Sequence, residues 1–161
     1  MHNDKSLFIS GGGHAQDTKQ LDSYFVSNLK NKIILYIPIG LQKTFVGYDE
    51  CFEWINNTLN QYTEKPLEIE MWVNLHNKKS DSLSKIDAVY IGGGKNSYQL
   101  MKLFKETGFV DILRKYYDAG GCIYGGSTGA IIIGKYISVF GETPTDDYIY
   151  DDGLNLIGNY S

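Results

Sequence analysis

Cysteine is scarce in this chain of 161 residues, which contains only Cys51 and Cys122. Two cysteines cannot form the disulfide framework of a small secreted domain, so both are expected to be free thiols. The N-terminus lacks the apolar stretch of a signal peptide, and no apolar run approaches the roughly 18 residues that span a membrane. We therefore expect a cytoplasmic protein that does not cross a membrane.

Positive charge is also in short supply, because 15 lysines and arginines stand against 19 acidic residues and leave a net charge of -4. Without a basic patch, the chain offers no electrostatic basis for binding nucleic acid or an anionic membrane surface. None of the three histidines is spaced with another histidine, a cysteine or an acid as metal ligands are. We therefore predict no metal and no other cofactor.

The order of apolar segments indicates one α/β domain over residues 1–161. Short β-branched runs alternate with segments of helical periodicity, which favours right-handed crossovers and a mainly parallel sheet covered on both faces. The expected fold class is therefore a three-layer, doubly wound α/β sandwich. The predicted strands are residues 6–10, 32–37, 67–73, 88–91 and 122–125, and the predicted helices lie near 21–29, 49–59, 97–107 and 110–117.

The most informative motif runs from Gly125 to Ala130 and joins a buried strand to an apolar run. A serine at the tip of a sharp strand-to-helix turn needs small neighbours two residues before and after it, because a Cβ there would collide across the turn. Gly125 and Gly129 meet that need around Ser127. Such a turn also points the N–H of Thr128 toward charge that develops beside the serine oxygen. Ser127 is therefore a candidate nucleophile for acyl transfer.

The same string also occurs in turns that merely connect a strand to a helix, but a second glycine cluster argues for chemistry. Residues 92–94 are three glycines that directly follow the predicted strand 88–91. Sites in open parallel sheets form at the carboxyl ends of strands, so both turns are expected to face one crevice. The N–H of Gly93 or Gly94 would then complete an oxyanion hole with Thr128.

The last stretch of the sequence differs from the rest. Polar turns at 141–147 and 151–153 lead into the apolar segment 154–159, where we expect the beginning of a final strand. A sheet that ends there is incomplete, so the C-terminal part of the domain is expected to be missing. An uncovered edge strand invites association, which makes a homodimer the expected assembly.

The chain resembles the peptidase E (α-aspartyl dipeptidase) family of serine peptidases, which includes the cyanophycinases and has the class I glutamine amidotransferase-like fold. The resemblance covers most of the chain. It rests on the segments Ser10–Gly13, Ile91–Asn96, Gly126–Ala130, Glu142–Pro144 and Gly153–Leu156. It implies a serine-type peptidase that acts on small acidic peptides such as N-terminal aspartyl dipeptides.

By position, the resemblance makes Ser127 the nucleophile on its elbow, and Thr128 with Gly93 or Gly94 the donors of the oxyanion hole. The family usually has alanine after the serine, but a threonine at this place keeps the backbone N–H. The resemblance also places the acidic member of the triad at Glu142, just before a Thr-Pro pair, with glutamate where the family has aspartate.

The acid of the triad has two alternatives in this sequence, and the base has no match in it. Asp146 and Asp147 are neighbouring alternatives to the acid named above. The family's histidine follows a segment like Leu154–Leu156, and the sequence reaches Ser161 before such a histidine. A serine hydroxyl is a weak nucleophile without a base, and a lost triad member removes most of the roughly 10⁴- to 10⁶-fold that the triad contributes. We therefore expect at most residual hydrolysis.

The three histidines that are present differ in their expected surroundings. His2 near the terminus and His76 in a polar loop are expected to be solvated. His14 follows three glycines at the carboxyl end of the first strand, so it is expected to overlook the crevice. A role in helix capping or substrate contact is favoured there over general base catalysis. Asn96, in the second glycine turn, is another candidate for substrate binding.

Three functions compete on these grounds. The first is hydrolysis of small acidic or aspartyl peptides through Ser127. The second is a catalytically silent homologue that binds a small acidic ligand or a protein partner, which the missing histidine favours. The third, an amidotransferase-type nucleophile at Cys122, is disfavoured because this cysteine lies inside a strand, where thiols are normally buried and inert.

Overall fold

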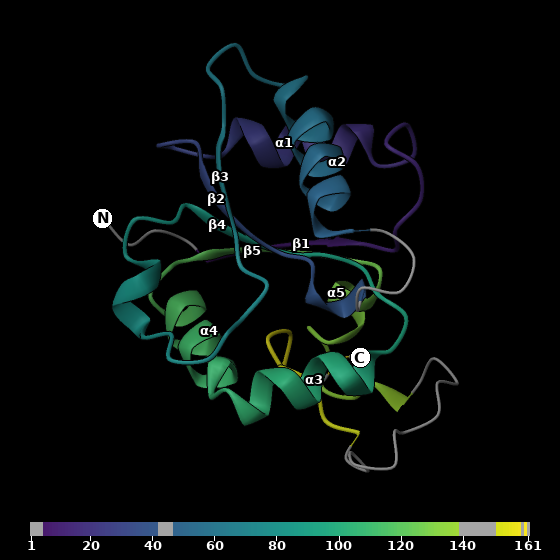
Figure 1. Ribbon diagram of the computed structural model, residues 1–161, viewed down its shortest axis with the longest axis vertical. Helices are drawn as coiled ribbons and strands as arrows, with labels where there is room; N and C mark the ends of the chain where they lie inside the picture. The colour runs from purple at the N-terminus through teal and green to yellow at the C-terminus, as the bar shows by residue number, and fades with distance from the viewer. Residues whose placement is uncertain (1–4, 42–46, 139–150, 159, 161) are drawn as a thin grey trace.

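The computed structural model describes residues 5–41, 47–138, 151–158 and 160. Its centre is a five-stranded sheet in the order β1-β5-β4-β2-β3, in which every neighbouring pair of strands is parallel (Figure 1). The predicted α/β fold with a mainly parallel sheet is therefore confirmed. The strands are β1 (Ser6–Ser10), β2 (Ile33–Ile37), β3 (Glu68–Met71), β4 (Ala88–Ile91) and β5 (Cys122–Gly126).

Helices cover both faces of the sheet, which makes three layers. Helices α1 and α2 lie on one side of it and α3 and α4 on the other (Figure 1). The helices are α1 (Lys19–Ser27), α2 (Tyr48–Asn60), α3 (Ser97–Glu106), α4 (Phe109–Asp118) and the single turn α5 (Thr128–Ile131), with 3₁₀ turns at Ile39–Leu41 and Ser80–Leu83. None of these helices is long and apolar enough to cross a bilayer.

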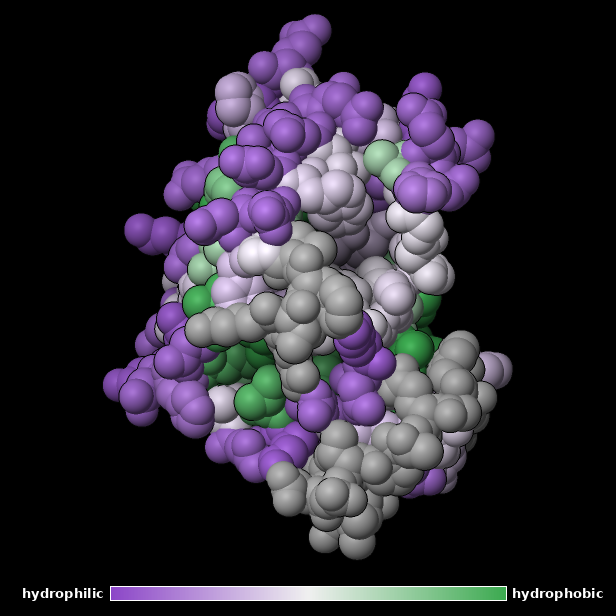
Figure 2. Space-filling model, turned by 45° about the vertical axis from the view of Figure 1, so that its right-hand side comes forward, coloured by the Kyte–Doolittle hydropathy of each residue, from purple (hydrophilic) through white to green (hydrophobic). Residues whose placement is uncertain are grey.

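Each face of the sheet has its own apolar core. Phe25 of α1 and Ile55 of α2 are completely buried in the core on one face, and Phe104 of α3 and Leu113 of α4 in the core on the other. The central strands supply side chains to both, which is why all four residues of β4 are apolar and buried. Figure 2 shows mainly hydrophilic side chains over the upper helices, whereas apolar side chains reach the surface in the lower half of that view.

The segment after α5 folds differently from its prediction. Within the described residues 151–158 there is an isolated antiparallel bridge, between Tyr136 and Asp152, but no strand. The N–H of Leu154 instead donates to the carbonyl of Ile132 at 2.6 Å, and the Leu154 side chain is fully buried. The backbone turns at Asn155, where φ is +52°, so the expected extended run is interrupted there. The prediction of a beginning strand is therefore wrong.

Candidate active site

Three strands end side by side at the carboxyl edge of the sheet. In the register of the sheet, Ser10 at the end of β1 lies opposite Gly126, and Ile91 at the end of β4 lies opposite Gly125. The loops that follow these strands therefore leave the sheet at one place. This brings together the glycines after β1, the glycines after β4 and Ser127, which directly follows β5.

Ser127 has an unusual backbone conformation for a residue with a side chain. Its φ is +52° and its ψ is -118°, values that are costly for an L-residue and are held only where the surroundings enforce them. Its N–H donates to the carbonyl of Ser10 at 2.8 Å, and its carbonyl accepts the N–H of Ala130 at 2.8 Å. A strained serine between a strand and a helix is the geometry of a nucleophile elbow.

The two glycines that flank the elbow leave no room for a side chain. A Cβ on Gly125 would stand 2.6 Å from the carbonyl oxygen of Gly129. A Cβ on Gly129 would overlap the carbonyl oxygen of Ile91 at the end of β4. The small residues that the sequence places around Ser127 are thus required by contacts across the turn and with the neighbouring strand.

Two further glycines lie against the side chain of Ser127. A Cβ built on Gly12, in the loop after β1, would stand 3.2 Å from Ser127 Cβ and 3.7 Å from its Oγ. A Cβ built on Gly93, in the loop after β4, would stand 3.2 Å and 3.6 Å from the same two atoms. Gly94 instead packs against the backbone of Gly40. Of the two glycines named from sequence for the oxyanion hole, Gly93 is therefore the one that touches Ser127.

Thr128 joins the elbow to the second glycine loop. Its side chain is only 2% exposed, and its Oγ1 donates a hydrogen bond of 2.6 Å to the carbonyl of Gly94. Its N–H belongs to the first turn of α5, where backbone N–H groups have no acceptor within the helix. The side chain of Thr128 therefore ties the elbow to the loop after β4.

The structure gives the proposed substrate-binding residues definite local roles. Asn96 caps α3, because its Oδ1 accepts the N–H of Gln99 at 3.0 Å. His14 is exposed, and its N–H donates to Oδ2 of Asp17 at 2.8 Å in a turn that leads into α1. His14 is two residues beyond Gly12, so it belongs to the loop that lies against Ser127. Contact of His14 or Asn96 with a substrate stays a prediction.

The acid and base of a triad are not found next to Ser127 in the part of the chain that the structure describes. Glu142 and its alternatives Asp146 and Asp147 lie outside the described residues, as does His2. Neither His14 nor His76 forms a hydrogen bond with Ser127. The assignment of the acid therefore stays a prediction.

A pair of buried polar residues beneath this edge was not predicted from sequence. Asp22 of α1 is 2% exposed, and its Oδ1 accepts a hydrogen bond of 2.6 Å from the hydroxyl of Tyr124 in β5. On the sequence, Asp22 reads as a polar position of an amphipathic helix. The signal that could have found it is the tyrosine three residues before the elbow, because a buried phenol needs a partner.

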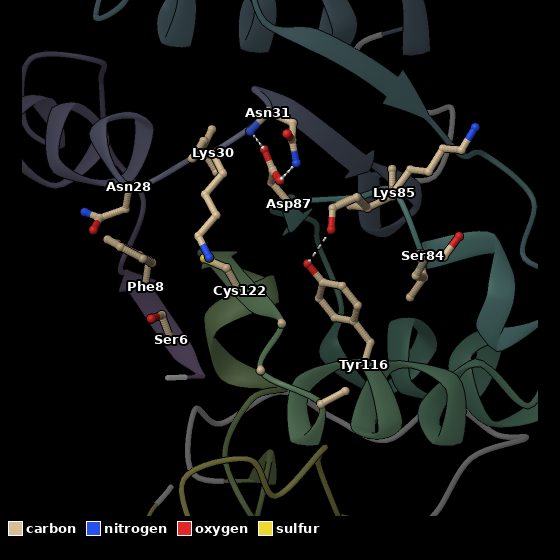
Figure 3. A pocket seen from close by; sticks show the side chains of 16 residues that line it. Ser6, Phe8, Asn28, Lys30, Asn31, Ser84, Lys85, Asp87, Tyr116 and Cys122 are labelled. Carbon is tan, nitrogen blue, oxygen red and sulfur yellow. Dashed lines mark hydrogen bonds between the residues drawn. The ribbon is translucent and has the colours of Figure 1, made fainter. Parts of the chain in front are cut away.

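A pocket of about 600 Å³ lies at the opposite, amino edge of the sheet (Figure 3). Its wall includes Cys122, Asp87 and Tyr116, and the Tyr116 hydroxyl donates to the carbonyl of Ile86 at 3.2 Å. Burial, and secondarily the charge of Asp87, raises the pKa of the Cys122 thiol to about 12. Such a thiol is protonated at neutral pH, and it lies at the other end of β5 from Ser127. Both facts argue against a cysteine nucleophile.

Comparison with known proteins connects this geometry with peptidases. The model of Peptidase family S51 matches residues 7–160. Peptidase E of Actinobacillus pleuropneumoniae serotype 3 is 27% identical to the chain over an alignment covering 94% of the chain and 64% of that relative. Peptidase E of Haemophilus influenzae strain PittGG is 28% identical, with 82% of the chain and 53% of the relative covered. The chain thus spans less than two thirds of the length of these relatives.

Two solved structures share the fold. A peptidase E-like protein from Listeria monocytogenes EGD-e superposes with a TM-score of 0.76 at 25% identity, covering 96% of the chain and 76% of that protein. A peptidase from an acI-B1 Actinobacterium superposes with a TM-score of 0.70 over 98% of the chain and 67% of that protein, at 18% identity. The second likeness concerns the fold alone.

Proposed function

Because the chain belongs to peptidase family S51, we propose that it hydrolyses small acidic or aspartyl peptides with Ser127 as the nucleophile. The observation that carries this proposal is the conformation of Ser127. Its φ is +52° at the junction of β5 and α5, and Gly12 and Gly93 lie against its side chain. The longer relatives are named Peptidase E, which supports peptide hydrolysis, and the acidic substrate class follows from the family resemblance.

In the proposed reaction, Ser127 Oγ attacks the carbonyl carbon of the scissile peptide bond and loses its proton to a base. The carbonyl oxygen gains negative charge as the tetrahedral intermediate forms. The N–H groups of Thr128 and Gly93 are the proposed donors to that oxygen, because one follows the nucleophile directly and the other lies against its side chain. Loss of a single such donor typically costs about 10²- to 10³-fold in rate.

The base and the acid are the open part of the proposal. The resemblance assigns the acid to Glu142 and places the histidine beyond Leu154–Leu156. The serine hydroxyl is weakly nucleophilic without a histidine base, so we expect these 161 residues to hydrolyse peptides slowly.

A fluorophosphonate probe tests the nucleophile directly. We expect the probe to label the chain, and Ser127→Ala to abolish the label. Ser84→Ala is the matched control, because Ser84 is an exposed serine at the amino edge of the sheet. Hydrolysis of Asp-Xaa dipeptides, compared with Leu-Xaa dipeptides of the same Xaa, tests the substrate class. Labelling that persists in Ser127→Ala would overturn the proposal.

The second candidate is a silent homologue that binds a small acidic ligand or a protein partner. It is favoured by one observation, that no histidine forms a hydrogen bond with Ser127 among the described residues. This candidate predicts that the fluorophosphonate does not label the chain and that the chain hydrolyses no dipeptide. It also predicts that acidic dipeptides raise the melting temperature of the protein, whereas dipeptides without an acid do not.

A further inference from the structure

Asp22, Tyr124 and Ser10 form a polar network that leads from α1 to the elbow. It begins at Asp22, whose Oδ2 accepts a hydrogen bond of 2.6 Å from Thr18 Oγ1 and whose Oδ1 accepts one of 2.6 Å from the Tyr124 hydroxyl. Both carboxylate oxygens are therefore engaged by hydroxyl donors. Asp22 is 2% exposed, and it forms no ion pair among the residues that the structure describes.

A buried carboxylate without a cation is expensive for a fold. Its transfer out of water costs several kcal/mol unless hydrogen bonds replace the lost hydration, and even then an apolar residue of the same size is often no less stable. Stability alone is therefore a poor reason for Asp22. What the carboxylate does supply is a strong acceptor that orients the Tyr124 hydroxyl in one direction.

The Tyr124 side chain borders the end of β1. The phenol donates to Asp22. In the register of β1 and β5, Ser10 is two residues beyond the partner of Tyr124, so the two side chains are diagonal neighbours on one face of the sheet. Ser10 is 7% exposed, and its Oγ accepts the N–H of Gly12 at 3.2 Å. The hydrogen bond from Gly12 to Ser10 and the one from Tyr124 to Asp22 therefore lie next to each other on the same face of β1 and β5.

Ser10 and Gly12, at the far end of this polar network, are the residues that hold the nucleophile. Ser10 accepts the N–H of Ser127 with its carbonyl at 2.8 Å, and Gly12 lies against the Cβ and Oγ of Ser127. We infer that Asp22 is a positioning residue for Ser127, acting through Tyr124 and Ser10 to keep the loop after β1 against the nucleophile. This inference rests on the proposed function for its kinetic consequence, but not for the positioning itself.

Removal of the Tyr124 hydroxyl interrupts the polar network without a change in packing. The ring of Tyr124 stacks on Tyr90 with centroids 4.3 Å apart and meets Phe25 edge-on at 5.0 Å. A phenylalanine fills the same volume, so Tyr124→Phe is expected to fold. Tyr116→Phe is the matched control, because it also removes one hydroxyl bonded to an oxygen acceptor, but at the amino edge of the sheet.

Amide hydrogen exchange, resolved by NMR, reads the positioning directly. The amides of Gly12 and Ser127 both donate to Ser10, so both report on the loop. We expect their exchange to quicken about tenfold in Tyr124→Phe and in Asp22→Asn, with amides of β2 unchanged, and to stay as in the wild type in Tyr116→Phe. A general loss of stability would instead raise exchange in β2 as well.

The kinetic readout is the maximal rate of labelling by a fluorophosphonate, separated from the concentration that gives half of that rate. We expect Tyr124→Phe to lower the maximal rate about tenfold or more and to leave the half-saturating concentration nearly unchanged, because misplacement of a nucleophile costs rate rather than affinity. The double variant Ser10→Ala with Tyr124→Phe is expected to have a maximal labelling rate little below that of the single variants, because both substitutions interrupt the same polar network.

The outcomes separate the two proposals. Unchanged exchange at Gly12 and Ser127 in both Tyr124→Phe and Asp22→Asn overturns the inference, whatever the activity. Quickened exchange in a protein whose wild type is neither labelled nor active supports the positioning and overturns the proposed function. Quickened exchange with a normal labelling rate overturns the claim that this positioning matters to Ser127.

Discussion

The N–H of Ser127 donates to the carbonyl oxygen of Ser10 at 2.8 Å, so the last residue of β1 holds the residue that follows β5. This bond continues the pairing of the two strands beyond their ends. A serine with φ at +52° needs such support, because the conformation costs about 1–3 kcal/mol when nothing enforces it. The strained elbow is thus a property of the sheet edge as much as of the turn.

The contact between Gly129 and β4 makes a stability prediction. A Cβ at Gly129 would overlap the carbonyl oxygen of Ile91 and stand 3.0 Å from that of Gly92. We expect Gly129→Ala to lower the free energy of unfolding by about 1–3 kcal/mol, measured by urea denaturation. Gly11→Ala is the control, because nothing lies within 4 Å of a Cβ there, and it should stay within about 0.5 kcal/mol of the wild type. Equal losses in both variants would contradict the prediction.

The contact between Gly93 and Ser127 makes a prediction about reactivity. A methyl group at Gly93 would stand 3.2 Å from Ser127 Cβ and 3.6 Å from Oγ, so it would crowd the nucleophile. We expect Gly93→Ala to slow fluorophosphonate labelling at least about tenfold, since misplaced reacting groups lose rate steeply. Circular dichroism and the melting temperature should show a folded protein. A normal labelling rate in a folded Gly93→Ala protein would remove Gly93 from the site.

Much of the fold was predictable, because its central strands are buried on both faces. The runs 33–37 and 88–91 are apolar throughout and match β2 and β4. The elbow was predictable for a similar reason, since only glycines fit around Ser127. The segment after Gly153 was not, because its apolar pattern gives no sign of the turn at Asn155.

Details of the site that depend on distant contacts could not be read from the sequence. Gly93 and Gly94 are equivalent in a run of three glycines, and only the packing of Gly94 on Gly40 separates them. Asp22 and Tyr124 are 102 residues apart in the sequence, and their hydrogen bond exists only once α1 lies on the sheet. Local patterns predict elements, whereas partners across the core require the assembled layers.

The bond between Thr128 and Gly94 predicts a graded series of variants. Thr128→Val keeps the shape of the side chain but leaves a partly buried carbonyl without its donor, which should lower the free energy of unfolding by about 1 kcal/mol. Thr128→Ser keeps a hydroxyl and should lose less. Urea denaturation measures both, and the prediction fails if the serine variant is the less stable of the two.

The titration of buried groups predicts how stability changes with pH. Burial raises the pKa of Cys122 from 9.0 to about 12, and it also raises the pKa of Tyr116 and of Tyr124. The folded protein therefore keeps protons that the unfolded chain releases above about pH 9, so the contribution of these groups to stability is complete below pH 9 and declines as the pH rises.

We expect the urea midpoint to be level from pH 7 to 8.5 and to fall between pH 9 and 11. Each group contributes at most about 1.4 kcal/mol per pH unit in this window, and less where solvent reaches it. Cys122→Ala removes the group that titrates first, so its midpoint should fall less than that of the wild type between pH 9 and 10. Parallel curves for the two proteins would show that the thiol is not held protonated by the fold.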